Sequence, residues 1–189
     1  MSDALRPASV QLSVASRERV GCKGPAAEAW LASRGIDVPP GANRYSVDSA
    51  GVLSARLATS EFLLEATDDR SDASLGALRR ALERADMPSG VYAVLRDDFV
   101  LEISGTQMQD LFLQTCAVDL DPIARESTET TGPVVLTSMM GVSVVLACRQ
   151  LPDGPRFTAW SDPSYSTYFH SQLQAIAAEI RGEAGGVHP

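Results

Sequence analysis

Side chains that could carry out covalent or metal chemistry are few in this sequence. Only two histidines are present, His170 and His188, and the three cysteines Cys22, Cys116 and Cys148 are far apart. A metal ion needs several Cys, His or carboxylate side chains that converge, and a histidine base needs a nucleophile and an orienting carboxylate beside it. We therefore predict no metal ligand and no catalytic residue, and we expect His170 on the polar flank of a helix.

Two further patterns have simpler explanations than a binding site. Residues 21–25 (Gly-Cys-Lys-Gly-Pro) lie between strand-like and helix-like segments, but they lack a third glycine and have proline where a phosphate would need an N–H donor. The adjacent acids Asp97 and Asp98 fall in a predicted turn, where short carboxylates form local hydrogen bonds. The sequence thus predicts no cofactor-binding residue.

Binding of a protein partner is easier to place than chemistry. Aromatic residues gather at the last strand-to-helix junction, and such side chains are common interface anchors. Core packing accounts equally well for Trp160 and Tyr165. A short apolar alternation in residues 1–18 predicts an arm that pairs with another sheet edge, or a frayed end. The candidate partner-binding residues are Trp160, Tyr165 and Tyr168 at the junction and Val10, Leu12 and Val14 in the arm.

Composition limits the possible partners. The net charge of -8 opposes binding to nucleic acid or to an anionic membrane surface, because Lys and Arg supply the affinity for both. No apolar stretch has the length of a membrane span, and three scattered cysteines in apolar runs are typical of buried thiols in a reducing compartment. We expect a cytoplasmic globular protein with one core, or with two closely fused half-cores.

The first half of the chain predicts strands and two helices. Residues 19–23 are strand-like, and the Gly-Pro that follows begins a helix that ends at Gly35. Residues 52–57 and 62–66 form an expected hairpin, and residues 71–86 form an amphipathic helix.

The second half predicts a further hairpin, residues 91–95 and 99–104, and then a helix from Gly105 to about Cys116. Residues 121–133 are polar and non-periodic, which predicts an exposed and mobile connection.

Three more strands, residues 134–137, 142–148 and 157–160, complete the sheet. Asp162 is expected to cap the last helix, and residues 182–189 form a predicted disordered tail.

A strand, a glycine and a helix in residues 20–35 are echoed in residues 100–116. We therefore expect an α+β fold with two pseudo-repeated half-domains, residues 19–90 and 91–181. Each half-domain would contain an antiparallel or mixed sheet with flanking helices.

Three segments in order carry a family resemblance. They are residues 19–31 (Arg-Val-Gly-Cys-Lys-Gly-Pro-Ala-Ala-Glu-Ala-Trp-Leu), residues 55–64 with Ala-Arg-Leu and Glu-Phe-Leu-Leu, and residues 160–165 (Trp-Ser-Asp-Pro-Ser-Tyr). Together they resemble the γ subunit of heterotetrameric sarcosine oxidases over residues 19–180. That family is similar to the folate-binding domain of the glycine cleavage T-protein, which is built from two half-domains.

The resemblance implies an accessory, non-catalytic subunit that stabilises a flavin-dependent complex oxidising an N-methyl amine such as sarcosine. It implies larger α and β subunits and a small δ subunit as partners. By the same resemblance, FAD, FMN, NAD and tetrahydrofolate bind to those partners, and this chain holds no cofactor.

The chain departs from the folate-binding relatives at their acidic hairpin. Where they resemble Gly-Gly-x-x-Asp-Asp, residues 50–55 are Ala-Gly-Val-Leu-Ser-Ala, and an Asn-Asp pair is represented by Ile36-Asp37. Neither Ser54 nor Ala55 can transfer a proton to a folate at neutral pH. Two alternatives stay open: a domain that still binds a folate for one-carbon transfer, and a stand-alone interaction module that adds its arm to another sheet.

Overall fold

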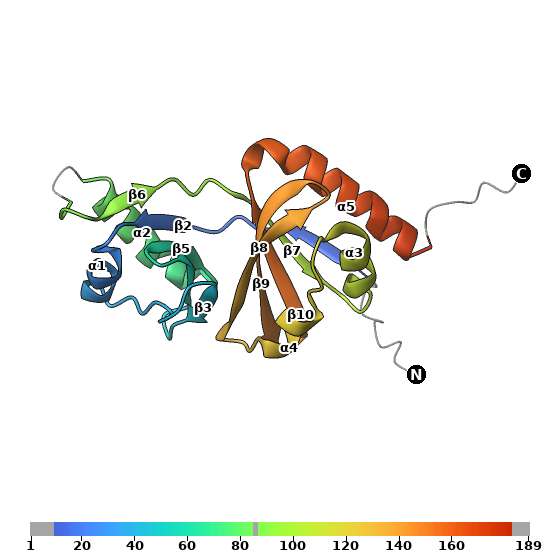
Figure 1. Cartoon of the computed structure of the whole chain (residues 1–189), viewed down its shortest axis with the longest axis horizontal. Helices are drawn as coiled ribbons and strands as arrows, with labels where there is room; N and C mark the ends of the chain where they lie inside the picture. The colour runs from blue at the N-terminus through green and yellow to red at the C-terminus, as the bar shows by residue number, and fades with distance from the viewer. Residues whose placement is uncertain (1–9, 85–86, 183–189) are drawn as a thin grey trace, which may run out of the picture. The chain divides into compact units, whose positions relative to one another are not determined.

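The computed structural model describes residues 10–84 and 87–182, which form two compact units (Figure 1). Unit 1 contains residues 10–15, 98–125 and 136–182, and unit 2 contains residues 16–97 and 126–135. Each unit is built on an antiparallel sheet with a few helices. Within the described residues, no helix is long and apolar enough to span a bilayer.

The sheet of unit 2 has the strand order β8-β3-β4-β5-β2-β6, where only the first part of β8 (Thr131–Met139) belongs to this unit. Strand β2 pairs with β5 and β6, β3 pairs with β4 and β8, and β4 pairs with β5, and all five pairs are antiparallel. Its elements are β2 (Arg19–Lys23), α1 (Ala27–Ser33), β3 (Arg44–Val47), β4 (Val52–Ala58), β5 (Glu61–Ala66), α2 (Asp69–Leu82) and β6 (Tyr92–Val94).

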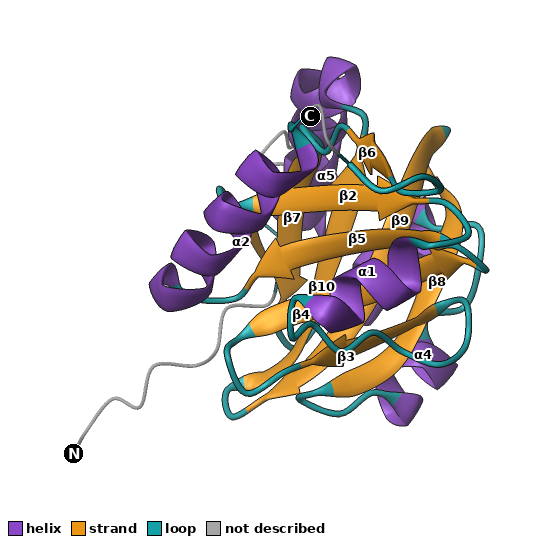
Figure 2. Cartoon of the chain, turned by 90° about the vertical axis from the view of Figure 1, so that its left-hand side faces the viewer, coloured by secondary structure: helices purple, strands orange, loops and turns teal. Residues whose placement is uncertain are grey.

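Helices α1 and α2 lie over one face of this sheet (Figure 2). Trp30 and Leu31 of α1 and Leu75 and Leu78 of α2 are buried there with apolar residues of β2, β4 and β5. Helix α2 begins earlier than the predicted residue 71, because the side chain of Asp68 accepts a hydrogen bond from the Ser71 backbone N–H in a capping box. Residues 85–86, at its predicted end, lie outside the described residues.

The predicted hairpin of residues 91–95 and 99–104 is wrong. Strand β6 pairs with β2 in unit 2, whereas β7 (Phe99–Ser104) pairs with β1 (Gln11–Val14) and β10 (Gly154–Ser161) in unit 1. Both long edges of β7 are occupied by those two strands, so no edge is left for β6. The short polar segment between β6 and β7 therefore joins two sheets instead of turning within one.

The sheet of unit 1 has the order β1-β7-β10-β9-β8, where only the second part of β8 belongs to the unit. The C-terminal strands follow the predicted segments and extend beyond them. The remaining elements are α3 (Met108–Thr115), α4 (Asp121–Glu126), β8 (Thr131–Met139), β9 (Val142–Leu151), a 3-10 turn η1 (Pro163–Tyr165) and α5 (Ser166–Ile180).

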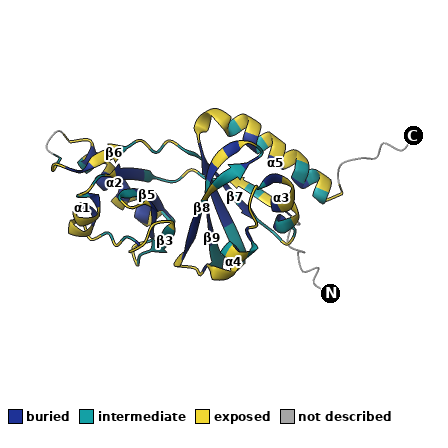
Figure 3. Cartoon of the chain, in the orientation of Figure 1, coloured by how far each residue is buried: buried dark blue, intermediate teal, exposed yellow. Residues whose placement is uncertain are grey.

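Helix α5 buries one stripe and leaves its opposite face exposed (Figure 3). Phe169, Leu173 and Ala177 are the fully buried positions, four residues apart. Tyr165, which the predicted stripe included, lies instead in the 3-10 turn before the helix and is exposed. Asp162 accepts a hydrogen bond from the Ser164 backbone N–H and so caps this 3-10 turn. It does not cap the last helix as predicted, because the N-cap of α5 is Tyr165, which makes no side-chain cap hydrogen bond.

Two other predictions need correction. Residues 121–133 are not an exposed connection throughout, because they contain helix α4 and the start of β8, and Ser127 is buried. The hydroxyl of Tyr45 donates a hydrogen bond to the Thr128 carbonyl, which ties this segment to β3. Strand β3 has no counterpart among the predicted elements, because the alternation of its four residues is too short to stand out from the loop before it.

Candidate functional site

The aromatic residues at the last strand-to-helix junction separate into two kinds. Trp160 in β10 is only 1% exposed, so it belongs to the core of unit 1. Tyr165 and Tyr168 are each 49% exposed, and the Tyr168 hydroxyl contacts the Met140 carbonyl at 3.4 Å. The two tyrosines keep the apolar ring surface that a partner could cover. Their role in binding stays a prediction.

The predicted arm forms strand β1, which pairs with the chain's own β7 with Leu12 opposite Ile103. Val10 is buried, Leu12 is half-buried and Val14 is 52% exposed. Ser104 and Arg181 also contact this segment, through the Gln11 side chain and the Val10 carbonyl. Because β1 is the last strand in its sheet order, its outer edge and Val14 are the parts that a partner strand could use. Residues 1–9 lie outside the described residues.

Several exposed apolar side chains were not predicted as candidates. Leu113 of α3 is 79% exposed, and Tyr92 and Leu95 are exposed at the β6 edge of unit 2. The signal for Leu113 was present in the sequence, because it falls off the helical stripe formed by Met108, Leu111 and Phe112. The exposure of Tyr92 and Leu95 depends on β6 being an edge strand, which local sequence patterns do not reveal.

The ionisable groups whose pKa is shifted have structural explanations. Burial raises the pKa of the Cys22 thiol to about 12, so it is protonated and inert at neutral pH. Backbone and side-chain hydrogen bonds from Ser71 lower the pKa of Asp68, and bonds from the Ser164 side chain and backbone lower that of Asp162. Both carboxylates are helix caps. Within residues 10–84 and 87–182, no group of three or more His, Cys, Asp or Glu could hold a metal ion.

Residues 50–55, where the sequence departs from the pattern expected of a folate-binding relative, form the start of β4 and the end of the turn before it. Ser54 and Ala55 are both buried in this strand, and Ser54 lies opposite Ser46 of β3 and Leu64 of β5. The turn itself contains Asp48, whose Oδ1 accepts hydrogen bonds from the Ala50 and Val52 backbone N–H groups at 2.8 and 2.9 Å.

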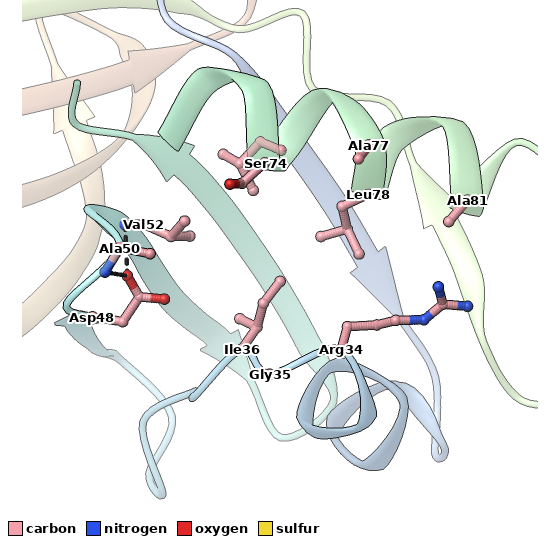
Figure 4. A pocket seen from close by; sticks show the side chains of 11 residues that line it. Arg34, Gly35, Ile36, Asp48, Ala50, Val52, Ser74, Ala77, Leu78 and Ala81 are labelled. Atoms are coloured by element: carbon pink, nitrogen blue, oxygen red, sulfur yellow. Dashed lines mark hydrogen bonds between the residues drawn. The ribbon is translucent and has the colours of Figure 1, made fainter. Parts of the chain in front are cut away.

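A cavity of about 270 Å³ opens in unit 2 between α2, the end of α1 and the turn before β4 (Figure 4). Its walls are mainly apolar, with Asp48, Arg34 and Ser74 as the polar residues. The apolar lining residues are Ile36, Ala50, Val52, Leu75, Ala77, Leu78 and Ala81. The sequence pattern does not reveal this cavity, because the lining residues come from three separate segments and only Asp48 and Arg34 are charged.

No family model matches the sequence, and no curated protein matches it. The structure is similar to a chain of the heterotetrameric sarcosine oxidase from Corynebacterium sp. U-96, solved in complex with pyrrole 2-carboxylate. The TM-score is 0.70 at 23% identity, with 95% of this chain and 88% of that chain covered. It is also similar to the glycine cleavage system aminomethyltransferase T from Bartonella henselae, with a TM-score of 0.56 at 16% identity.

The chain shares the fold of these two proteins. The match to the aminomethyltransferase covers 88% of this chain but 45% of the other, so this chain spans less than half of that protein. The predicted resemblance to both groups is therefore confirmed for the fold.

His170, the histidine considered as a possible base, lies on α5 and is partly exposed. The centroid of its ring is 6.2 Å from the centroid of the Phe99 ring.

Proposed function

We propose that this chain is a non-catalytic accessory subunit of a flavin-dependent oxidase complex that acts on an N-methyl amine such as sarcosine. The observation that carries the proposal is the length of the fold match, which extends over 95% of this chain and 88% of a chain from a heterotetrameric sarcosine oxidase. Two chains of the same extent and fold are good candidates for the same place in an assembly.

The chemistry of the ionisable groups supports a role without catalysis. A general acid or base has a pKa tuned toward the operating pH. Here burial moves the pKa of Cys22 to about 12, away from neutrality, and the lowered pKa of Asp68 and Asp162 belongs to carboxylates engaged as helix caps. By this proposal FAD, FMN, NAD and tetrahydrofolate bind to the α and β subunits, a small δ subunit completes the cytoplasmic complex, and this chain stabilises it.

Co-expression with the products of the neighbouring genes tests the proposal. The expected result is co-elution of this chain with a flavin-containing, amine-oxidising complex on size-exclusion chromatography, while the isolated chain has no flavin absorbance. If the neighbours assemble into an active oxidase and this chain still elutes as a lone monomer, the subunit role is refuted.

A folate-binding domain for one-carbon transfer is the second candidate, favoured by the fold shared with an aminomethyltransferase. The buried, non-acidic pair Ser54 and Ala55 argues against it, because a proton acceptor at neutral pH is missing from that strand position. Titration of the isolated chain with tetrahydrofolate, followed by tryptophan fluorescence, separates the two. Saturable binding would favour the second candidate.

The internal repeat of the fold is a second part of the proposal. We infer that the half-domains predicted at residues 19–90 and 91–181 are diverged copies. In support, β2 is followed by Gly24 and α1, and β7 by Gly105 and α3, and the two glycines have similar φ angles of 120° and 112°. A crystal structure in which these strand–glycine–helix segments do not superpose would contradict the inference.

A further inference from the structure

The cavity of unit 2 has opposite charges at its two ends. Figure 4 shows the Asp48 carboxylate at one end and the Arg34 side chain at the other, with Ile36 and Leu78 between them. In the part of the chain that the structure describes, neither charged group forms an ion pair. The guanidinium of Arg34 lies 5.2 Å from the centre of the Trp30 ring. This arrangement is complementary to a molecule with a charge at each end and an apolar middle.

The Asp48 carboxylate is held in place before any ligand arrives. Its Oδ1 accepts the two backbone hydrogen bonds of the turn, from Ala50 and Val52. Its second oxygen forms no such bond within the described residues and points toward the cavity (Figure 4). Because the turn already orders the side chain, a cation can bind the second oxygen with little loss of conformational entropy.

The remaining walls fit a small ligand. Val52, Leu75 and Leu78 are buried, and they form an apolar surface that is fixed by the core of unit 2. A cavity of about 270 Å³ lies just below the range of about 300–1,000 Å³ for ligand sites, so it suits a small metabolite better than a nucleotide or a folate. Ser74 offers a hydroxyl group on the α2 wall.

We propose that this cavity binds a small zwitterion, with its ammonium group at Asp48, its carboxylate at Arg34 and a short apolar chain against Ile36 and Leu78. The site is separate from the subunit role, because it uses only residues of unit 2 and does not depend on any partner. Its ligand class is an amino acid or amine-carboxylate whose two charges are separated by several methylene groups.

A titration of the isotopically labelled full chain, followed by amide chemical shifts, tests the proposal. The probes are ε-aminocaproate, which has both charges, caproate, which has only the carboxylate, and n-hexylammonium, which has only the cation. We expect ε-aminocaproate to shift amides of residues 34–36, 48–52 and 74–81 in a saturable manner. Its affinity should exceed that of either single-charge probe by about threefold or more.

Variants assign each end of the ligand. Asp48→Asn keeps an oxygen for the turn and should remove the advantage of ε-aminocaproate over caproate. Arg34→Gln should remove its advantage over n-hexylammonium. Arg80→Gln is the matched control, because it removes a positive charge from the same unit, on α2, without lining the cavity.

Three results would overturn the proposal: equal affinities for the three probes, shifts scattered outside unit 2, or an Arg80→Gln variant that weakens binding as much as Arg34→Gln. Ala77→Phe is a second check, because an exposed wall position can accept the ring, which then fills the cavity. Unchanged binding of ε-aminocaproate to a folded Ala77→Phe chain would also contradict the site.

Discussion

Arg56 connects three segments of unit 2 with one nearly buried guanidinium group. It donates hydrogen bonds to the carbonyls of Pro39, Pro40 and Thr59 and forms an ion pair with Glu28 at 2.9 Å. We expect Arg56→Met to lower the free energy of unfolding by about 2–4 kcal/mol, because three carbonyls lose their donor and the bond to the Pro39 carbonyl is buried. Urea denaturation followed by circular dichroism measures this loss.

The matched control for Arg56 is Glu28→Gln, which changes the exposed partner of the same ion pair. Its expected cost is at most about 1 kcal/mol, as for other solvent-exposed pairs. Equal losses in the two variants would mean that the ion pair, and not the carbonyl contacts, is what Arg56 contributes.

The cysteines differ in accessibility, which predicts a labelling order. Cys22 is buried and burial raises the pKa of its thiol to about 12, whereas Cys116 is partly exposed at the end of α3. Because the thiolate is the reactive species, iodoacetamide at mildly alkaline pH should modify Cys116 first and leave Cys22 intact in the folded protein. Peptide mass spectrometry over a time course reports the order, and Cys116→Ser should abolish the fast phase. Early modification of Cys22 would contradict its burial.

Asp68 gives α2 a cap that depends on pH. Hydrogen bonds from Ser71 lower its pKa below the ordinary 3.8, so the folded state holds the proton less tightly than the unfolded chain. The stability that this cap provides is therefore full above pH 3.8 and is lost as the pH falls through the lower folded-state value. The variant Asp68→Asn keeps a good N-cap residue that has no ionisable group, so it serves as the pH-independent reference. The thermal midpoint of the wild type minus that of Asp68→Asn should be constant near neutral pH and decrease in acid. A constant difference throughout would contradict the assignment.

At the scale of elements, the junction between β2 and α1 requires glycine at position 24. Gly24 has a φ of 120°, and a Cβ atom there would lie 2.2 Å from the Gly90 carbonyl oxygen. We expect Gly24→Ala to destabilise the fold by about 2–4 kcal/mol, from backbone strain and from this clash. Gly35→Ala is the control, because Gly35 also has a positive φ but an added Cβ atom would meet nothing within 4 Å. Its cost should be about 1 kcal/mol, and equal costs in a denaturation experiment would show that the clash is relieved.

Elements with strong local signals were predictable from the sequence. Residues 19–23 match β2, because a short strand-like run ends at the Gly-Pro turn that precedes α1. The stripe of Phe169 and Leu173 identified α5. Strand β3 was missed, because it has only four residues and only one of them, Tyr45, is buried, so its sequence pattern is weak. The β6–β7 hairpin was wrong, because Arg96, Asp97 and Asp98 have turn-forming composition while strand pairing is decided by distant partners.

At the scale of the whole molecule, neither unit is a continuous stretch of chain. Unit 2 takes residues 126–135 from the second half of the sequence, and Arg44, Tyr45 and Ser46 of β3 pair with residues 131–133 there. Tyr165 and Tyr168 of the candidate partner surface were identified from the sequence, because they follow the Asp162-Pro163 pair that marks the start of the last helical segment. The cavity was not, because Arg34, Asp48 and Ser74 become neighbours only through the packing of α2 on the sheet.

If the chain is an accessory subunit, exposed aromatic rings are the best candidates for anchors in the interface. Tyr165 and Tyr168 are each 49% exposed, and each ring exposes apolar area that assembly could bury. We expect the double variant Tyr165→Ser and Tyr168→Ser to bind the partner subunits about 30-fold to 700-fold more weakly, since each interface tyrosine contributes about 1–2 kcal/mol and the two losses add. The thermal midpoint of the isolated chain should change little. Gln172→Ser, one turn along the exposed face of α5, is the control and should assemble like the wild type. Analytical ultracentrifugation of the co-expressed complex measures the difference, and normal assembly by the double variant would move the interface away from this end of α5.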